Sequence, residues 1–373
     1  MNTHMNLDLD AEAITFRDEV RDWLAAHVPA RPLPDVDTEP GDAAHRAWER
    51  ELAEARLSVV SWPSAYGGRD ASPLHWLLFE EEYHAAGAPV RVGQNGLFLL
   101  APTLFAHGTP EQRDRLLPRM ARADDVWAQA WSEPDAGSDL AAIRSTATRT
   151  DGGWLLSGQK TWSSRATHAD RAFGLFRTDP AAGRHRGLTY LMFGLRTAGV
   201  TVRPIRQLGG GTGFAEIFLD GVFVPDTDVI GAAGEGWTVA MSTASHERGL
   251  SLRSPGRFLA TARRLVDLWQ RAGSPAELRD RVADAWIAAQ AYRLHCFATV
   301  SGESRPGSAG SMTKVFWSEL DVALHETALD LLGLQGDPDW LDGYLFSLAG
   351  PIYAGTNEIQ RTVVAERVLG LPR

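Results

Sequence analysis

Hydrophobic residues recur at helical spacing in the first third of the chain. One apolar stripe is formed by Phe16, Val20, Trp23, Leu24 and Val28, a period that predicts an amphipathic helix. A turn-rich loop, "WPSAYGGRDASP", leads into a second helical run through Phe79 and Tyr83. The stretch "TPEQ" at Thr109–Gln112 has the spacing of a capping box and predicts another helix start. We therefore expect a helical domain over residues 1–124.

The periodicity changes near Val126. Short β-rich runs follow one another, separated by Gly, Pro and Asp: "RAFGLFRT", "GLTYLMFGL", "VTVRPI" and "AEIFLDGVFVP". Asp151-Gly152 lies between two such runs and predicts a hairpin turn. This spacing predicts a compact β domain over residues 125–230, either a barrel or a sandwich.

Helical patterns return after residue 230. "SPAE" at Ser274–Glu277 has capping-box spacing, and "TKVFWSELDVALHETALDLLG" is amphipathic up to Gly333. The last helix is expected from Asn357 to about Gly370, and "SGESRPGSAGS" is expected to be a loop. Residues 231–373 are thus predicted to form an α-helical domain, a four-helix bundle. The fold class is α+β, in the order α, β, α.

Composition and charge restrict the function. The 373 residues are 44% hydrophobic and carry a formal charge of -10, which disfavours nucleic acid and anionic membranes as partners. The N-terminal stretch has neither a basic nor an apolar segment of the kind found in signal peptides, and no apolar run is long enough to span a membrane. The single cysteine, Cys296, excludes an internal disulfide and is expected to be a packed core thiol. We expect a cytoplasmic protein.

The common sequence motifs for cofactors and nucleophiles are absent. "LGGGTGF" lacks the G-x-G-x-x-G spacing of a dinucleotide fingerprint, and no phosphate loop follows it. No His/Cys cluster has metal-ligand spacing, and no G-x-S-x-G elbow occurs. We expect no metal site, and any cofactor must be held by another arrangement.

Four stretches carry a family resemblance. They are "AQAWSEPDAGSDL" (residues 128–140), "SGQKTWSSRATHAD" (157–170), "HERG" (246–249) and "IYAGTNEIQRTVVAERVLGLPR" (352–373). Taken alone, each of the first two is an ordinary polar loop. In this order and at these separations, the four resemble the flavin-dependent acyl-CoA dehydrogenases, and the resemblance covers essentially the whole chain.

The resemblance implies bound FAD and assigns its contacts. The position of Trp162 corresponds to the tryptophan packed near the flavin ring, and that of Ser164 to a hydroxyl that bonds flavin N5, the hydride acceptor. A flat ring with a polar edge needs such an aromatic wall and such donors. Glu133 and Asp139 are expected to brace their loop rather than to act in catalysis. The cofactor-binding residues implied are Gln129, Trp131, Ser132, Ser138, Trp162, Ser163, Ser164, Thr356, Asn357 and Glu358.

The catalytic base is the residue at which this chain departs from many family members. Those members carry a Glu directly before the Gly-Thr of the closing turn, where this chain has Ala354. In branches resembling the isovaleryl and long-chain enzymes, the Glu instead precedes an Arg on a helix, and Glu247–Arg248 matches that pair. The resemblance therefore implies Glu247 as the base. The substrate contacts implied are Ser138, Arg248, Ala354 and Gly355, with the main-chain N–H of Ala354 holding the thioester carbonyl.

Other features leave alternatives open. The Arg-x-Phe-Gly segment that grips a neighbouring subunit's flavin in the family is matched here only at Arg271, and a later glycine-rich turn only at Gly333 and Gly336. The leading hypothesis is dehydrogenation of an acyl-CoA or acyl-carrier thioester by a homotetramer or heterotetramer, with an electron-transfer flavoprotein as acceptor. One alternative is a non-catalytic partner subunit, and another is a flavin oxidase or monooxygenase. The acyl group is branched, long or ring-bearing.

Overall fold

The computed structural model describes residues 9–247, 254–300 and 309–372. The described residues form two compact units, and each unit is assembled from segments that are far apart in the sequence. The helical unit comprises the described parts of residues 1–30, 71–88 and 248–373. The sheet unit comprises residues 31–70 and 89–247.

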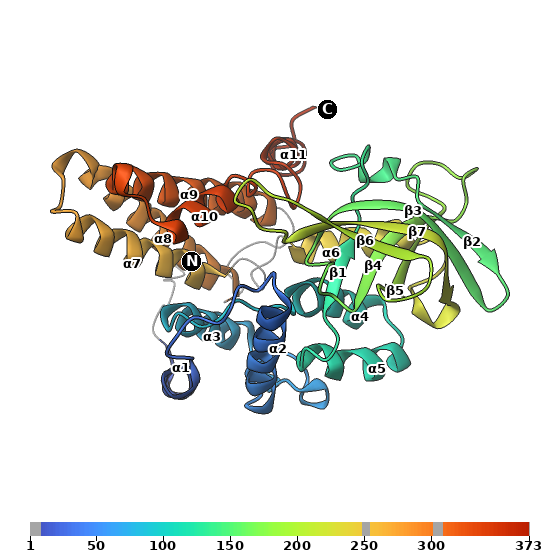
Figure 1. The fold of residues 1–373 in the computed structure, drawn as a ribbon, viewed down its shortest axis with the longest axis horizontal. Helices are drawn as coiled ribbons and strands as arrows, with labels where there is room; N and C mark the ends of the chain where they lie inside the picture. The colour runs from blue at the N-terminus through green and yellow to red at the C-terminus, as the bar shows by residue number, and fades with distance from the viewer. Residues whose placement is uncertain (1–8, 248–253, 301–308, 373) are drawn as a thin grey trace. The chain divides into compact units, whose positions relative to one another are not determined.

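The sheet unit is built on one β-sheet. Its strands among the described residues are β1 (Trp127–Ala130), β2 (Thr146–Thr150), β3 (Gly153–Ser164), β4 (Arg171–Arg177), β5 (Leu188–Gly194), β6 (Val200–Ile205), β7 (Phe214–Pro225) and β8 (Val229–Ile230). They run in the order β6-β7-β3-β2-β4-β5-β8, and β1 pairs in parallel with β4. Figure 1 labels β1 to β7 of this sheet. The β-rich character predicted for this part of the chain is confirmed.

The central strand β3 pairs on both sides. Its hairpin with β2 turns at Asp151-Gly152, as predicted, and Gly152 has the positive φ of 71° that this turn requires. Its long antiparallel pairing with β7 shifts register twice, the second time between Lys160 and Ser163. This second irregularity falls inside the "GQKTW" motif.

Helices of the sheet unit are α2 (Glu39–Glu54), α4 (Ala101–His107), α5 (Pro110–Ala121) and α6 (Gly236–Glu247). The predicted capping box of α5 is present, with Thr109 accepting from the N–H of Gln112 and Gln112 accepting from the N–H of Thr109. The side-chain amide nitrogen of Gln112 also donates to the carbonyl of Thr227 at 2.9 Å, which ties the start of α5 to η4 (Asp226–Asp228), directly after β7. Short 3-10 helices are η1 (Ser64–Tyr66), η3 (Leu140–Ala142) and η4 (Asp226–Asp228), and η2 (Gly96–Leu100) is a short π-helix.

The helical unit contains both ends of the described chain. Its helices are α1 (Ala11–His27), α3 (Pro73–Ala85), α7 (Pro255–Arg271), α8 (Arg279–Val300), α9 (Ala309–Leu332), α10 (Pro338–Ser347) and α11 (Asn357–Val363), with short turns η5 (Ala276–Leu278), η6 (Gly333–Gln335) and η7 (Val364–Val368). The predicted stripe of α1 buries Phe16, Val20 and Leu24. As predicted, α9 stops at Gly333, and the last helical segment begins at Asn357.

Two early helices pack on late ones in the helical unit. Glu82 of α3 pairs with Arg21 of α1 at 2.7 Å, and Glu81 of α3 pairs with Arg293 of α8 at 2.7 Å. Helix α3 also packs along α7. The unit therefore joins helices from the predicted N-terminal and C-terminal domains, and the boundaries near residues 124 and 230 stay predictions.

Two local predictions are wrong. Ser274 does not cap a helix, because it has a φ of 56° and the following turn η5 has Pro275 at its cap position without a side-chain bond. The predicted loop "SGESRPGSAGS" ends too late: Ala309–Ser311 belong to α9, and the remaining residues, 301–308, lie outside the described part of the chain. Ser311 is only 4% exposed, so packing overrides its low helix propensity.

Among the described residues, no helix has both the length and the apolar character that crossing a membrane requires.

Candidate active site

The structure brings two of the predicted motif segments together in the sheet unit. Ser132 follows β1, and its carbonyl accepts a hydrogen bond from the N–H of Thr161 in β3 at 2.9 Å. Trp131, just before it, donates its indole N–H to the hydroxyl of Tyr190 in β5 at 3.0 Å. The segments around Ser132 and Trp162 are therefore neighbours in space, although about thirty residues separate them in sequence.

Trp162 stands on an irregular point of β3. Its φ is 57°, in the left-handed region that bulky residues rarely adopt, and its side chain is 59% exposed. The register shift between Lys160 and Ser163 marks a bulge. The Phe214 ring contacts the indole edge-on, at 6.0 Å between centroids. Such a conformation costs on the order of 1–3 kcal/mol, and backbone strain of this kind is concentrated at functional sites.

Two buried polar atoms in the predicted motif segments of this unit lack a partner. The Ser163 hydroxyl and the Gln129 amide nitrogen are buried and have no hydrogen-bond partner in the described part of the chain. Ser164, the next residue after Ser163, is half-buried at the end of β3. An exposed indole beside unpartnered donors fits a flat ring with a polar edge. The residues present therefore fit a flavin.

The loop after Ser132 is braced as predicted. Glu133 accepts hydrogen bonds from the N–H groups of Arg144 and Ser145 at 2.6 and 2.9 Å, and it pairs with Lys160. Burial alone raises the pKa of Glu133, but the Lys160 ammonium and the N–H of Arg144 outweigh it, so this pKa lies below its usual value. Ser138 is exposed in the same loop. The expectation that Glu133 is a bracing residue is confirmed.

The closing turn in the helical unit has an unusual backbone. Ala354 and Gly355 have φ values of 57° and 79°. Their carbonyls accept from the side-chain amide of Gln360 at 3.0 and 3.4 Å, and a Cβ at Gly355 would lie 2.4 Å from that nitrogen. Neither main-chain N–H of these two residues has an acceptor among the residues described. The turn therefore presents two adjacent free donors, the arrangement that an oxyanion requires.

Asn357 anchors this turn. It is 3% exposed, and its side-chain oxygen accepts from Lys314 Nζ at 2.8 Å and from the Ser318 hydroxyl at 3.1 Å. Thr356 caps α11 through the N–H of Ile359. Glu358 is exposed, and hydrogen bonds from its own main-chain N–H and from Thr356 lower its pKa. The Asn357 side chain thus bonds within the helical unit and shapes the turn.

The predicted base lies at the end of a well-anchored helix. Glu247 is the last residue of α6, and its side chain is outside the described part of the structure. Arg248 lies outside the described residues altogether. Helix α6 is fixed to α4 by a buried hydrogen bond of 2.8 Å between the hydroxyls of Thr103 and Thr243. The predicted site residues accordingly fall into two sets, residues 129–164 with Glu247 in the sheet unit and residues 354–358 in the helical unit.

Sequence analysis missed three buried polar residues that hold these segments. Lys160 lies inside a predicted motif, Lys314 belongs to α9, and Gln360 belongs to α11. Lys314 and Ser318 stand four residues apart on the buried face of α9, beside Trp317. A polar pair at helical spacing among apolar residues is the signal that would have identified Lys314.

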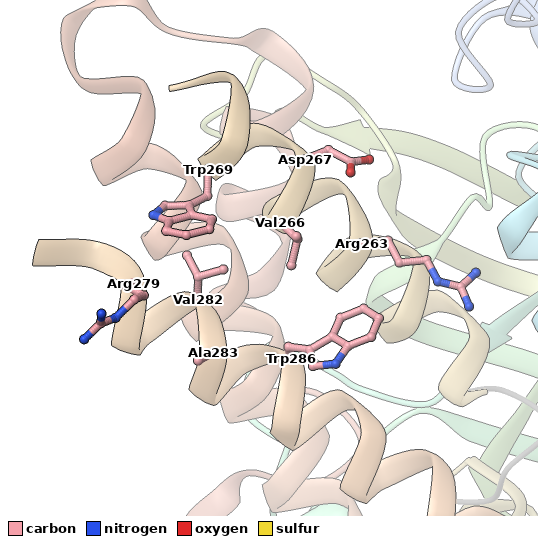
Figure 2. Close-up of a pocket in the computed structure, with 8 residues that line it drawn as sticks. All are labelled: Arg263, Val266, Asp267, Trp269, Arg279, Val282, Ala283 and Trp286. Carbon is pink, nitrogen blue, oxygen red and sulfur yellow. The ribbon is translucent and has the colours of Figure 1, made fainter. Parts of the chain in front are cut away.

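The hollow between α7 and α8 is a separate feature. Figure 2 shows Trp269 and Trp286 on its two sides, and its volume is about 360 Å³. None of the predicted site residues lines it. Within the described ranges, no group of three His, Cys, Asp or Glu residues is placed to hold a metal ion.

Comparison with known proteins identifies the family. Residues 10–124, 128–222 and 234–369 match the N-terminal, middle and C-terminal domains of acyl-CoA dehydrogenase. The acyl-CoA dehydrogenase IpdE1 of Mycobacterium tuberculosis is 40% identical, over 96% of this chain and 97% of the relative. IpdE1 of Mycolicibacterium smegmatis is also 40% identical, over 97% and 98%.

Solved structures agree with this assignment. The "Tcur3481-Tcur3483 steroid ACAD" has a TM-score of 0.85 at 26% identity, over 99% of this chain and all of the other. The ChsE4-ChsE5 complex from Mycobacterium tuberculosis has a TM-score of 0.84 at 27% identity, over 99% and 100%. The predicted fold class, with helical, β and helical parts, is confirmed. With all three domains matched in order, the chain belongs to the acyl-CoA dehydrogenase family of FAD-dependent oxidoreductases.

Proposed function

We propose that this acyl-CoA dehydrogenase removes two hydrogens from the α and β carbons of an acyl-CoA thioester, with bound FAD and with Glu247 as the base. The observation that carries the proposal is the bulge at Trp162. An exposed, left-handed tryptophan next to the buried, unpartnered hydroxyl of Ser163 is a costly arrangement that a bound flavin would make use of. Electrons then pass to an electron-transfer flavoprotein as acceptor.

On the cofactor side, the chain supplies a wall and donors. Bound FAD would supply the hydride acceptor for the β-hydrogen. The Trp162 indole would cover the flavin ring, and the hydroxyls of Ser132 and Ser164 would bond its polar edge. Gln129 and Ser163 are buried donors that still need acceptors.

On the substrate side, the chain must acidify the α C–H. The free N–H groups of Ala354 and Gly355 hold the thioester carbonyl and stabilise the negative charge that develops on its oxygen. Ala354 has no proton acceptor in its side chain, so the α-proton goes to the Glu247 carboxylate. The main-chain donors survive this change of side chain, because every residue except proline carries an N–H. Arg248 and Ser138 are the further substrate contacts that we propose.

We further propose a ring-bearing, steroid-derived acyl group. An alanine in place of a carboxylate at position 354 leaves room beside the thioester, and one structural neighbour carries the name "steroid ACAD". Anaerobic titration with straight-chain, branched and steroid-derived acyl-CoAs tests this directly. Bleaching of the flavin by the straight-chain thioester alone would contradict the proposed substrate class.

The base is tested by Glu247→Gln. The variant keeps the size and hydrogen bonding of the residue but cannot accept the proton, so it should bind FAD and substrate and lose flavin reduction. A positioned base contributes about 10²–10⁴-fold, and single-turnover reduction should slow by at least that factor. Glu235→Gln, an exposed Glu just before α6, is the matched control and should reduce at the wild-type rate. Wild-type reduction by Glu247→Gln would exclude Glu247 as the base.

A non-catalytic partner subunit remains the second candidate function. This chain matches only the arginine of the family's flavin-gripping Arg-x-Phe-Gly segment, at Arg271, and lacks the Phe-Gly. One structural neighbour is described as the ChsE4-ChsE5 complex. Absorbance distinguishes the two functions: the enzyme purified alone carries a flavin band, whereas a partner subunit stays colourless even after FAD is added. Oxygen consumption during turnover would indicate the oxidase alternative.

A further inference from the structure

We propose that the buried Lys160–Glu133 ion pair is a positioning pair, which holds the Trp162 bulge and the Ser132 segment in their flavin-binding geometry before FAD binds. The inference rests on the proposed function, because it assumes that FAD occupies the bulge. It assigns to Lys160 and Glu133 a role in cofactor binding, although neither residue is expected to touch the cofactor.

The Lys160 side chain is fully buried, and its ammonium group makes its full set of hydrogen bonds. It is 0% exposed, and its Nζ donates to Glu133 Oε1 at 2.9 Å, to the carbonyl of Leu175 at 2.8 Å and to the carbonyl of Trp131 at 3.3 Å. The three hydrogens of an ammonium group match these three acceptors in number. The ammonium also lies 4.7 Å from the centre of the Phe176 ring. One cation therefore connects β3, β4 and the segment that leaves β1.

Glu133 extends the connection to a further strand. Besides Lys160, it accepts from the N–H groups of Arg144 and Ser145, which lead into β2. The hydrogen bonds that its carboxylate accepts are charge-assisted, and such bonds are about twice as strong as neutral ones. The pair thus fixes the Ser132 loop against β2 and β3 together.

The location of the pair relates it to the bulge. The register of β3 against β7 is regular at Lys160 and resumes at Ser163. Between them, Thr161 donates to the carbonyl of Ser132, and beyond them the N–H of Arg165 donates to the carbonyl of Gly213 at 2.7 Å. Trp162 is therefore held between two fixed points, with Lys160 as the first. A left-handed tryptophan needs such surroundings, because its strain persists only where neighbouring structure imposes it.

An ion pair is not needed here for stability alone. Desolvation offsets most of the attraction within a buried pair, and apolar residues of similar volume often stabilise a core equally well. An ion pair with several directed hydrogen bonds additionally fixes the relative orientation of the segments that it joins. This difference separates a positioning role from a structural one.

The experiment compares Lys160→Met, Glu133→Gln and the double variant with the wild type. Each single variant leaves one buried charge without its opposite charge, so both its melting temperature and its FAD affinity should fall. The double variant removes both charges and should regain part of the melting temperature. Its FAD Kd, measured by fluorescence titration of the apoprotein, should stay raised at least tenfold. A double variant that binds FAD with the wild-type Kd overturns the proposal.

The matched control is Asp228→Asn. Asp228 is a buried carboxylate in the same unit, and it pairs with Arg171 at 2.8 Å without contacting a predicted cofactor residue. We expect a lower melting temperature and an FAD Kd within twofold of the wild type. An equal loss of FAD affinity in this control would show that any destabilisation of the sheet unit weakens FAD binding, and would overturn the positioning role.

A second measurement needs no variant and covers the case in which the variants do not fold. In the wild-type apoprotein, hydrogen exchange at the amides of Thr161 and Arg165 should be as slow as in the regular part of β3, since both are already bonded. Fast exchange that slows only when FAD is added would overturn positioning in advance of binding. A wild-type chain that binds no FAD overturns both this inference and the proposed function. If the wild-type chain binds FAD and the variants bind it with an unaltered Kd, only this inference is overturned.

Discussion

At the scale of single residues, Trp162 combines a strained backbone with an exposed side chain. Trp162→Gly relieves about 1–2 kcal/mol of left-handed strain and loses about 0.5–1.5 kcal/mol of edge contact with Phe214. The free energy of unfolding of the apoprotein should therefore change by less than about 1 kcal/mol, whereas the FAD Kd should rise at least tenfold.

Trp162→Phe is the control for this prediction. It keeps an aromatic wall, so its FAD Kd should stay within a few-fold of the wild type. Titration of both apoproteins with FAD gives the two values. Equal FAD affinity in the glycine variant and the wild type would show that the indole does not contact the cofactor.

Cys296 illustrates the opposite situation, a reactive group made inert by burial. It is buried in α8, and desolvation raises the pKa of its thiol to about 12. Because only the thiolate is nucleophilic, the native protein should not react with iodoacetamide at pH 8, whereas the unfolded chain should react fully. Intact-mass spectrometry measures both. Alkylation of the folded protein within minutes would contradict the burial of this side chain.

At the scale of elements, the contact between α9 and the closing turn depends on Asn357. Asn357→Leu removes the acceptor of two buried donors, Lys314 and Ser318, and should lower the free energy of unfolding by about 2–4 kcal/mol. Asn357→Asp keeps the acceptor and adds a charge opposite to that of Lys314, so its free energy of unfolding should fall much less. Denaturant unfolding of the two variants gives the comparison.

The same pair of variants tests the link from this element to catalysis. If the anchor places the free N–H groups of Ala354 and Gly355, Asn357→Leu should also lower kcat/KM, measured per bound FAD. A leucine variant that is as stable and as active as the aspartate variant would refute the anchoring role.

At the scale of the whole molecule, we predict a tetramer. Met312, Phe316 and Leu369 are exposed apolar residues beside one groove of the helical unit, and exposed apolar surface of this kind marks interfaces. Light scattering should give four times the 40.7 kDa of one chain, either alone or with a homologous partner. Phe316→Glu should reduce this mass. A 40.7 kDa species at micromolar concentration, with or without the partner, would contradict the prediction.

The sequence by itself determined the type and order of most elements in this protein. Hydrophobic period, capping residues and turn residues are local signals, and they located α1, the capping box at Thr109, the hairpin at Asp151-Gly152 and the end of α9. Four motifs also identified the family, because spacing along the chain is itself sequence information. Where local signals were weak, as at Ser274 and Ala309, they gave wrong helix starts.

Only the tertiary structure decided which of these elements meet. Helix α3 packs with α7 and α8, about two hundred residues later, and Lys160 finds its partner in Glu133 across the sheet. The left-handed φ of Trp162 and the free N–H groups of Ala354 and Gly355 likewise depend on neighbours distant in the chain. Such features arise from packing and from the hydrogen bonds that buried polar groups must make, and no local pattern of residue types encodes those partners.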